Sequence, residues 1–264
     1  MKNIVITGAT DGIGKLAAIQ LAKEGHSIFV HGRNEVKVSA TIAEIKADTN
    51  NQNISGLVAD MSDLNAVKQM ADKINRELPG IDVLINNAGV FKSSNILNKQ
   101  GVDLRFVVNY LAPYLLTTMI LPLLEKTKGS RIINLSSAAQ AAISYDAMLG
   151  KSPISVNESY AQSKLALTMW SFRLATELHE TSVIAVNPGS LLNTKMANEA
   201  YGQHWSPAEK GADILCDLAQ SKEHEGITGK YFDNDRGAWA NAHQLAYNEA
   251  AIDELIDFTQ KLID

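Results

Sequence analysis

The sequence of 264 residues is 45% hydrophobic and 20% charged, which predicts one ordinary globular domain with a large core. The net charge is −5 and no basic run is present, so we expect no nucleic-acid partner and no binding to an anionic membrane surface. Cys216 is the only cysteine, which excludes an internal disulfide and fits a reducing compartment. We find no charged-then-apolar leader and no apolar run of membrane-spanning length, and expect a cytoplasmic protein.

A glycine-rich turn follows the first predicted strand. Residues 4–7 form a short apolar strand, and TGATDGIG at 7–14 leads into an amphipathic helix that ends at Gly25. A helix N-terminus at such a joint points free N–H groups at a phosphate, which favours a dinucleotide site over a plain turn. Gly8 would permit the tight turn, Gly12 the approach of a pyrophosphate, and Gly14 close packing of the helix on the sheet.

The second predicted strand, 27–31, ends without an acidic residue. NAD-binding proteins usually place a carboxylate there to hold the ribose 2′-hydroxyl, but this chain has Gly32, followed by Arg33 and Asn34. A guanidinium attracts a 2′-phosphate and can hold it with two hydrogen bonds. The residues therefore predict NADP(H), the alternative being that Arg33 is a solvated loop residue.

The third predicted strand, 54–59, ends in Asp60-Met61. Asp60 lies where a carboxylate could accept from the adenine amino group. It could equally cap the following helix, predicted over 62–77, and both interpretations stay open.

The fourth predicted strand, 81–85, ends in Asn-Asn-Ala-Gly at 86–89. Small residues and amides at such a place let the backbone approach a ligand, so Asn87, Ala88 and Gly89 are predicted to border the cofactor. A plain turn after the strand is the alternative.

A long helix is predicted over 101–126, with the polar Asn109 inside an apolar segment. Such an amide needs partners, either in the backbone or in a bound water. The amide could also distort the helix. Pro113 cannot donate to the carbonyl of Asn109, which frees an acceptor there for a bound water.

The pair Tyr160 and Lys164 lies one turn apart on a helix predicted over 158–180. A nearby ammonium favours the phenolate and lowers the tyrosine pKa from its usual value of about 10, which makes a general acid/base. The alternative is a surface tyrosine packed on a lysine stem. The preceding strand, 131–135, ends in Ser136-Ser137, where open α/β sheets bind ligands, and an irregular excursion covers 138–157.

The remaining segments complete the domain. A strand at 183–186 leads to Pro188-Gly189 and a loop at 190–206, which with the 140–150 excursion would form an apolar lid. Leu191, Leu192, Met196, Tyr201 and Trp205 are its apolar residues. A C-terminal extension over 233–264 follows a helix starting near Ser206-Pro207 and a strand at 229–232, and it closes with a helix at 253–263.

Strand–helix alternation throughout predicts a doubly wound α/β domain over 1–264: a parallel sheet with helices on both faces and the site at the strands' carboxyl ends. The six histidines show no metal-binding spacing, so we expect no metal.

The ordered set of motifs resembles the short-chain dehydrogenase/reductase family over most of the chain. The motifs are TGATDGIG, Asp60, NNAG, Asn109, Ser136-Ser137, YAQSK at 160–164 and Pro188-Gly189. The resemblance implies a Rossmann fold in which Tyr160 gives and takes a proton and Lys164 lowers its pKa and holds the nicotinamide ribose. It also implies that Ser137 orients the substrate oxygen and Asn109 holds a water. The implied cofactor site consists of Gly8, Thr10, Asp11, Gly12, Ile13, Gly14, Arg33, Asn34, Asp60, Met61, Asn87, Ala88, Gly89, Tyr160, Lys164, Pro188, Gly189 and Thr194.

Two departures refine the resemblance. The long gap between Ser137 and Tyr160, with GVDLRFVVNYLAPYLL at 101–116, looks like the retinol-dehydrogenase-like branch. Where the family usually has a threonine after its Pro-Gly motif, this chain has Asn193, with Thr194 one residue later. We assign the nicotinamide-carboxamide contact to Thr194, with Asn193 as the alternative.

The resemblance implies reversible hydride transfer between NADP(H) and a carbonyl or alcohol, and we expect a lipophilic aldehyde or ketone as substrate and a homodimer or homotetramer. One alternative is a non-catalytic NADP(H)-binding redox sensor of the same fold, which the presence of Ser137, Tyr160 and Lys164 together argues against. A second alternative is non-redox chemistry such as dehalogenation, which has no use for Gly32-Arg33.

Overall fold

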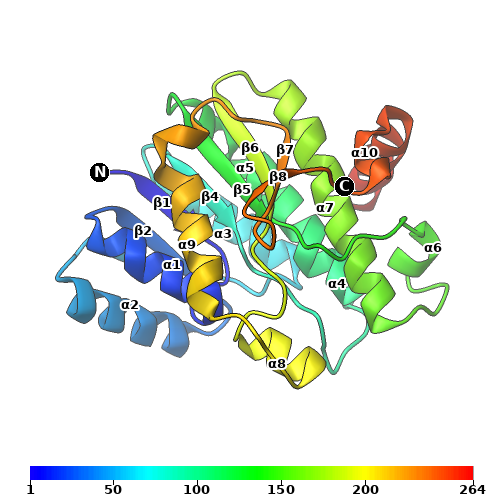
Figure 1. The fold of residues 1–264 in the computed structure, drawn as a ribbon, viewed down its shortest axis with the longest axis horizontal. Coiled ribbons are helices and arrows are strands. Elements are labelled where there is room, and N and C mark those ends of the chain that lie inside the picture. The colour runs from blue at the N-terminus through cyan, green and yellow to red at the C-terminus, as the bar shows by residue number, and fades with distance from the viewer. Residues whose placement is uncertain (264) are drawn as a thin grey trace.

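The computed structural model describes residues 1–263, except for the side chains of Ala200 and Tyr201. One eight-stranded sheet runs through the molecule in the order β3-β2-β1-β4-β5-β6-β7-β8 (Figure 1). All neighbours pair in parallel except β7 and β8. The strands are β1 Asn3–Ile6, β2 Ser27–Gly32, β3 Ile54–Val58, β4 Val83–Asn86, β5 Ser130–Leu135, β6 Thr181–Asn187, β7 Lys230–Asp233 and β8 Ala238–Ala240.

Helices cover both faces of this sheet, as the alternation predicted. They are α1 Gly12–Lys23, α2 Glu35–Thr49, α3 Leu64–Glu77, α4 Leu104–Phe106, α5 Ala112–Glu125, α6 Tyr145–Met148, α7 Val156–Glu177, α8 Lys195–Tyr201, α9 Ala208–Gln220 and α10 Glu249–Ile263. A π-helix, η1 Val107–Leu111, and two short 3-10 helices, η2 Lys222–His224 and η3 Gln244–Tyr247, complete the assignment.

The central strands are buried on both faces, which is why they read as apolar runs rather than alternating ones. Two apolar cores result, one with α3, α5 and α7 and the other with α1 and α9. The strand order reverses between β1 and β4, and such a switch point opens a crevice at the carboxyl ends of the two strands. The residues after β1 and β4 are the glycine turn and Asn87.

The long helix predicted over 101–126 is interrupted. It begins at Leu104 and passes through the π-helical η1, which contains Asn109, before α5 continues it. Pro113 lacks the N–H that an α-helix would offer to Asn109, which accounts for the wider turn here. The stretch Leu104–Glu125 is long and apolar enough to cross a membrane by length and composition, so the sequence-based statement that no such run exists is wrong. In the fold 78% of its most apolar window is buried, as in a core helix.

Other boundaries also differ from the prediction. Helix α9 begins at Ala208 after Pro207, and Ser206 does not cap it. A capping box does occur at the start of α7, where Ser155 and Glu158 bond each other's backbone. The short antiparallel β8 was not predicted, because its three residues carry little periodic signal.

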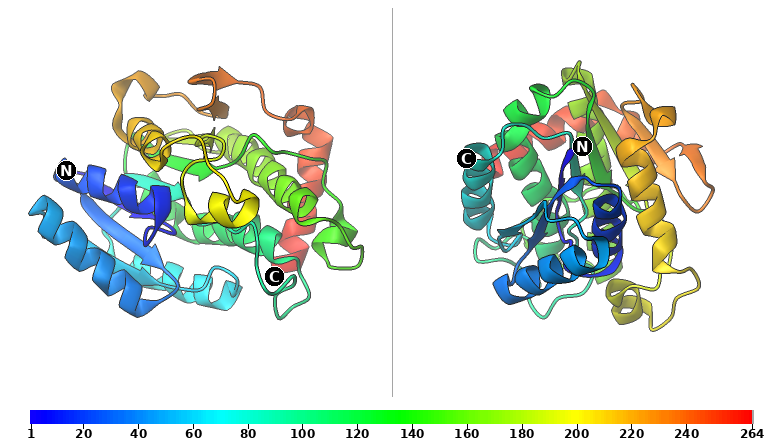
Figure 2. Two further views of the ribbon diagram at one scale, coloured as in Figure 1. Left: turned by 60° about the horizontal axis from the view of Figure 1, so that its bottom comes forward. Right: turned by 90° about the vertical axis from the view of Figure 1, so that its left-hand side faces the viewer.

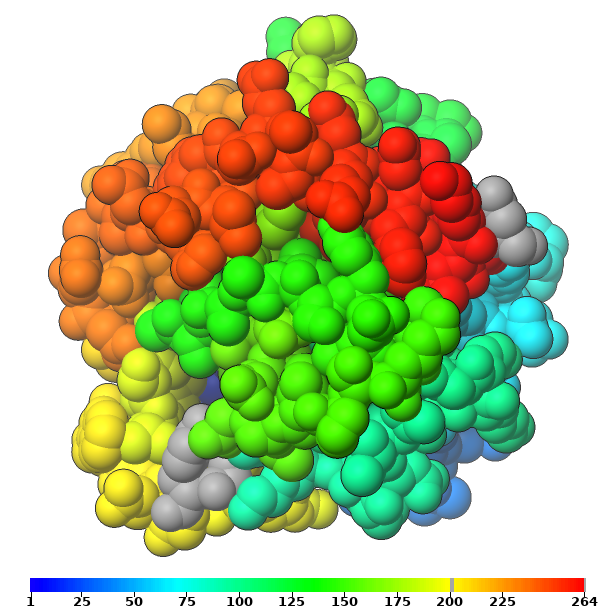
Figure 3. Space-filling view, turned by 90° about the vertical axis from the view of Figure 1, so that its right-hand side faces the viewer, coloured from blue at the N-terminus to red at the C-terminus, as the bar shows by residue number. Residues whose placement is uncertain are grey.

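The C-terminal segment packs on α7. Helix α10 begins four residues earlier than predicted, Thr259 hydrogen-bonds Tyr110 at 2.7 Å, and Asp253 pairs with Arg173. Figure 3 shows this orange and red segment lying against the green excursion at 138–157. The Tyr145 and Phe258 rings lie 4.5 Å apart there, so the excursion is part of the C-terminal packing.

Candidate active site

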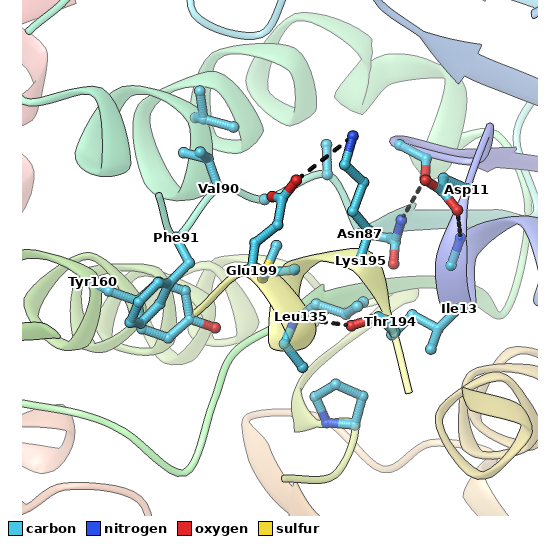
Figure 4. A pocket seen from close by; sticks show the side chains of 18 of the residues that line it. Asp11, Ile13, Asn87, Val90, Phe91, Leu135, Tyr160, Thr194, Lys195 and Glu199 are labelled. Carbon is cyan, nitrogen blue, oxygen red and sulfur yellow. Dashed lines mark hydrogen bonds and ion pairs between the residues drawn. The ribbon is translucent and has the colours of Figure 1, made fainter. Parts of the chain in front are cut away.

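A cavity of about 1210 Å³ opens at the carboxyl edge of the sheet. Its walls include every predicted site residue except Gly14 and Asn109. Figure 4 shows Asp11 and Ile13 at one end, Tyr160 and Phe91 at the other, and Thr194 between them. The fold therefore brings together residues that lie up to 186 positions apart, from Gly8 to Thr194.

The glycine turn forms one end of this cavity. Gly8 and Gly12 have φ of +65° and +55°, a region that L side chains rarely adopt. Asn87 Nδ2 donates to the carbonyl oxygens of Thr7 and Gly8, at 2.7 and 2.9 Å. A Cβ on Gly14 would lie 2.3 Å from that same nitrogen, so Gly14 makes room for Asn87 rather than for the sheet as predicted.

His31, which the sequence analysis missed, holds the glycine turn through both of its ring nitrogens. Its Nδ1 accepts from the N–H of Gly8 at 3.0 Å, so Nε2 carries the proton and donates to the carbonyl of Ala59 at 3.0 Å. Burial lowers the pKa of His31 to about 4, which keeps the ring neutral at ordinary pH. The turn is thus tied to the ends of both β2 and β3.

Two cations border the cavity next to β2. Arg33 is there as predicted, and Lys37, one turn into α2, was missed. Asn34 caps α2 by accepting from the N–H of Lys37 at 2.9 Å. A Cβ on Gly32 would lie 2.6 Å from Thr10 Cγ2, so the fold has no room for an acidic side chain at that position.

Asp60 lines the cavity and does not cap α3. Its Oδ1 accepts from the N–H and the hydroxyl of Ser62, while Asp63 caps the helix. The capping alternative is therefore wrong, and the carboxylate lies beside Met61 on the cavity wall.

Tyr160 and Lys164 lie together at the other end, on α7. Lys164 Nζ is 5.6 Å from the centre of the Tyr160 ring and donates to the carbonyl of Leu135 at 2.6 Å. The lysine side chain is only 4% exposed, and this burial lowers its pKa to about 7. The Phe91 ring packs 4.9 Å from that of Tyr160.

The two serines after β5 have different environments. Ser136 is buried and hydrogen-bonds Thr168 at 2.6 Å, whereas Ser137 lines the cavity. Ser137 Oγ accepts from the N–H of Ala139 at 3.1 Å, which leaves its own proton to be donated. Ser137 is thus the serine whose hydroxyl proton is available at the cavity, and its role toward a substrate stays a prediction.

Asn109 braces the site from behind the cavity wall. Its Oδ1 accepts from the N–H of Val90 at 2.8 Å, and its Nδ2 donates to the carbonyl of Val90 and to Ser163 Oγ, both at 3.0 Å. Ser163 in turn donates to the carbonyl of Tyr160 at 2.7 Å. The water predicted at Asn109 stays a prediction.

The turn after β6 is held by the hairpin that follows β7. Asn187 Nδ2 donates to the carboxylates of Asp233 and Asp235, and Asp235 also accepts from the N–H of Ser190 at 2.8 Å. Asn234 donates to the carbonyl of Pro188 at 2.8 Å. Pro188 and Gly189 thus face the cavity on a well-braced backbone.

The loop at 190–206 crosses the cavity and contains α8. Figure 2 (left) shows α8, in yellow, lying between α1 and α7. Thr194 caps α8 and faces Gly12, while Lys92 donates to the carbonyl of Glu199 from the opposite side. Thr194 lines the cavity and Asn193 does not, which favours Thr194 for the predicted nicotinamide contact.

The predicted apolar residues of this loop divide into two groups. Leu191, Leu192, Met196 and Trp205 line the cavity, and the Tyr201 side chain lies outside the described residues. Within the described part of the chain, no residue of 140–150 borders the cavity.

Among residues 1–263, no group of three His, Cys, Asp or Glu is arranged to hold a metal ion.

The family model described as short chain dehydrogenase matches residues 2–204, a span that contains every predicted site residue. The chain belongs to the short-chain dehydrogenase family. This short-chain dehydrogenase is 32% identical to human retinol dehydrogenase 13 over 252 residues, which cover 88% of the chain and 76% of the relative. It is 30% identical to mouse retinol dehydrogenase 12 over 274 residues, which cover 99% of this chain and 86% of the relative. Human polyprenol dehydrogenase is 29% identical to it over 254 residues, which cover 88% of this chain and 76% of the relative.

Two solved structures of bacterial short-chain dehydrogenases resemble the fold. One, from Shigella flexneri in complex with NADP, has a TM-score of 0.72 and 27% identity, covering 89% of this chain and 97% of that one. The other, from Escherichia coli in complex with NADPH, has a TM-score of 0.74 and 26% identity, covering 88% of this chain and 96% of that one. The protein is thus an NAD(P)-dependent oxidoreductase of the retinol-dehydrogenase-like branch that acts on CH–OH groups, as the sequence predicted.

Proposed function

We propose that this short-chain dehydrogenase transfers a hydride between NADP(H) and a lipophilic aldehyde or ketone, or the corresponding alcohol, with Tyr160 as general acid/base. The observation that carries the proposal is one cavity with a glycine cradle at one end and Ser137, Tyr160 and Lys164 at the other. A cofactor of dinucleotide length would connect the two ends.

The residues present fit NADP(H). Gly8 and Gly12 form a cradle without side chains at the start of α1, where free N–H groups favour a pyrophosphate. Arg33 and Lys37 supply two positive charges where the 2′-phosphate of NADP would lie, and Gly32 excludes the carboxylate that an NAD site prefers. The related structures that contain NADP and NADPH support the same choice.

A bound nicotinamide supplies or accepts the hydride. During reduction the Tyr160 hydroxyl gives its proton to the substrate oxygen, and Ser137 donates a second hydrogen bond to the same atom. The Lys164 ammonium lies close enough to stabilise the phenolate that Tyr160 becomes. During oxidation the same groups act in reverse, with Tyr160 taking the hydroxyl proton.

The cavity wall supports a lipophilic substrate. Apolar side chains from three segments line the cavity: Val90, Phe91, Leu104, Val108, Leu191, Leu192, Met196 and Trp205. Trp205 is 68% exposed, so an apolar chain leaving the cavity would pass along its ring.

The cytoplasmic location and the homodimeric or homotetrameric state stay predictions of the sequence.

The test is NADPH oxidation by the purified protein with aldehydes and ketones of increasing chain length, and NADP reduction with the matching alcohols. We expect turnover that grows with chain length and is at least tenfold faster with NADPH than with NADH. Binding of NADPH without turnover on any substrate would instead support the redox-sensor alternative.

A further inference from the structure

The carbonyl oxygen of Ser137 is held by two side chains, one three residues along the same loop and one from β7. Tyr231 Oη donates to it at 3.0 Å, and Gln140 Nε2 donates to it at 2.9 Å. A carbonyl oxygen has two lone pairs, and both are used here. The peptide that follows Ser137 is therefore fixed in rotation, although it lies in a loop after β5.

Tyr231 is a permanent donor in this arrangement. It lies on β7 and is 4% exposed. Burial, reinforced by the carboxylates of Asp233 and Asp235, raises the pKa of Tyr231, so its hydroxyl keeps its proton throughout the working pH range.

Gln140 links the same carbonyl to the C-terminal segment. Its Oε1 accepts from the backbone N–H of His243 at 3.1 Å. Both supports of Ser137 therefore depend on residues beyond 204, where the match to the family model ends.

We infer that Tyr231 and Gln140 are positioning residues that aim the Ser137 hydroxyl at the substrate oxygen. The inference rests on the proposed function, in which Ser137 donates to that oxygen. Ser137 Oγ already accepts from the N–H of Ala139, so the direction of its O–H depends on the orientation of this backbone. Releasing the carbonyl lets the peptide rotate and misaligns the donor, and such small misplacements slow catalysis strongly.

The experiment uses Tyr231→Phe and Gln140→Met, which keep the packing volume and remove the donors. Each is made in the wild-type chain and in Ser137→Ala, and kcat and KM are measured for one carbonyl substrate. With Ser137 present, we expect each variant to lower kcat about fivefold and leave the NADPH Kd unchanged. With Ser137→Ala, the same changes should alter kcat less than twofold, because no hydroxyl remains to be aimed.

Tyr247→Phe is the matched control. Its ring is 52% exposed, and its Oη accepts from the N–H of Ala242, next to the His243 that bonds Gln140. Tyr247→Phe therefore removes a hydroxyl from the same C-terminal segment and keeps both donors to the Ser137 carbonyl. It should change kcat less than twofold in both backgrounds. An equal loss from Tyr231→Phe with and without the Ser137 hydroxyl would overturn the inference in favour of a general structural role.

A second measurement does not require turnover. Amide hydrogen exchange at residues 137–140 should become faster in Tyr231→Phe than in wild type or in Tyr247→Phe, because the loop loses a tether. Unchanged exchange there would also overturn the inference. If the wild-type protein reduces no carbonyl, the proposed function fails, and the exchange result alone decides whether Tyr231 orders the loop.

Discussion

The two halves of this cavity are built in different ways. The nucleotide end uses backbone groups and short contiguous stretches, with the glycine turn after β1 and Arg33 after β2. The reacting end uses side chains from η1, the loop after β5, α7 and β7, and each is oriented by another segment. Binding a phosphate needs free N–H groups and space, whereas moving a proton needs side chains at fixed distances.

The largest effect is expected at Tyr160. Tyr160→Phe removes the proton donor at the reacting end and leaves the nucleotide end intact, so kcat should fall by about 10³-fold while NADPH binding is retained. Steady-state kinetics and a fluorescence titration with NADPH measure the two quantities. Tyr145→Phe, which packs on Phe258 outside the cavity, is the control and should keep kcat. Loss of turnover and NADPH binding together would indicate misfolding.

The next effect is expected at the nucleotide end. Gly14→Ala places a Cβ 2.3 Å from Asn87 Nδ2 and 2.8 Å from the Gly8 carbonyl oxygen, so the glycine turn must shift. Alanine favours helices by about 1 kcal/mol over glycine, so any loss must come from this clash. We expect the NADPH Kd to rise at least tenfold and the melting temperature to fall, with turnover at saturating NADPH less affected. An unchanged Kd would show that the turn does not hold the cofactor.

A smaller and more selective effect is expected at the 2′-phosphate. Arg33→Ala should raise the NADPH Kd about tenfold and leave that of NADH nearly unchanged, because only the 2′-phosphate interacts with the guanidinium. Lys37→Ala should act in the same direction with a smaller factor, because an ammonium makes no bidentate contact. Lys46→Ala, at the opposite end of α2, is the control for a loss of general positive charge. Equal losses for both cofactors would contradict the assignment.

The last effect concerns pH and stability rather than catalysis or cofactor binding. The pKa of Lys164 is about 7 in the folded chain, against 10.5 for an unperturbed lysine, so the unfolded chain binds more protons between these values. The stability of the cofactor-free chain should therefore rise with pH from about 7 to 10.5 through this residue. Lys164→Met removes that contribution, so the melting temperature of wild type should increase relative to the variant as the pH is raised from about 7 to about 9.5. Parallel curves for the two proteins would show that Lys164 is not buried as an amine.

Much of this organisation could be predicted from sequence, because it follows local signals. The glycine turn, Arg33, the pair of serines and the tyrosine–lysine spacing each lie within a few residues, and strand–helix alternation fixes the parallel sheet. His31 and Lys37 were missed, since a lone histidine in a strand and a lysine on a helix carry no specific pattern. A distortion of the long helix was one option that Asn109 left open, but its π-helical form was not foreseen.

The sequence by itself determined the fold class and indicated the glycine turn and the Tyr160–Lys164 pair, because periodicity and short motifs express local backbone preferences. Only the tertiary structure decided that Gly14 leaves room for the Asn87 side chain and that Lys164 is buried with a pKa of about 7. It also decided that Tyr231 and Gln140 both donate to the carbonyl of Ser137. These features depend on burial and on contacts between segments separated by as many as 94 residues, and no local pattern of amino acids encodes them.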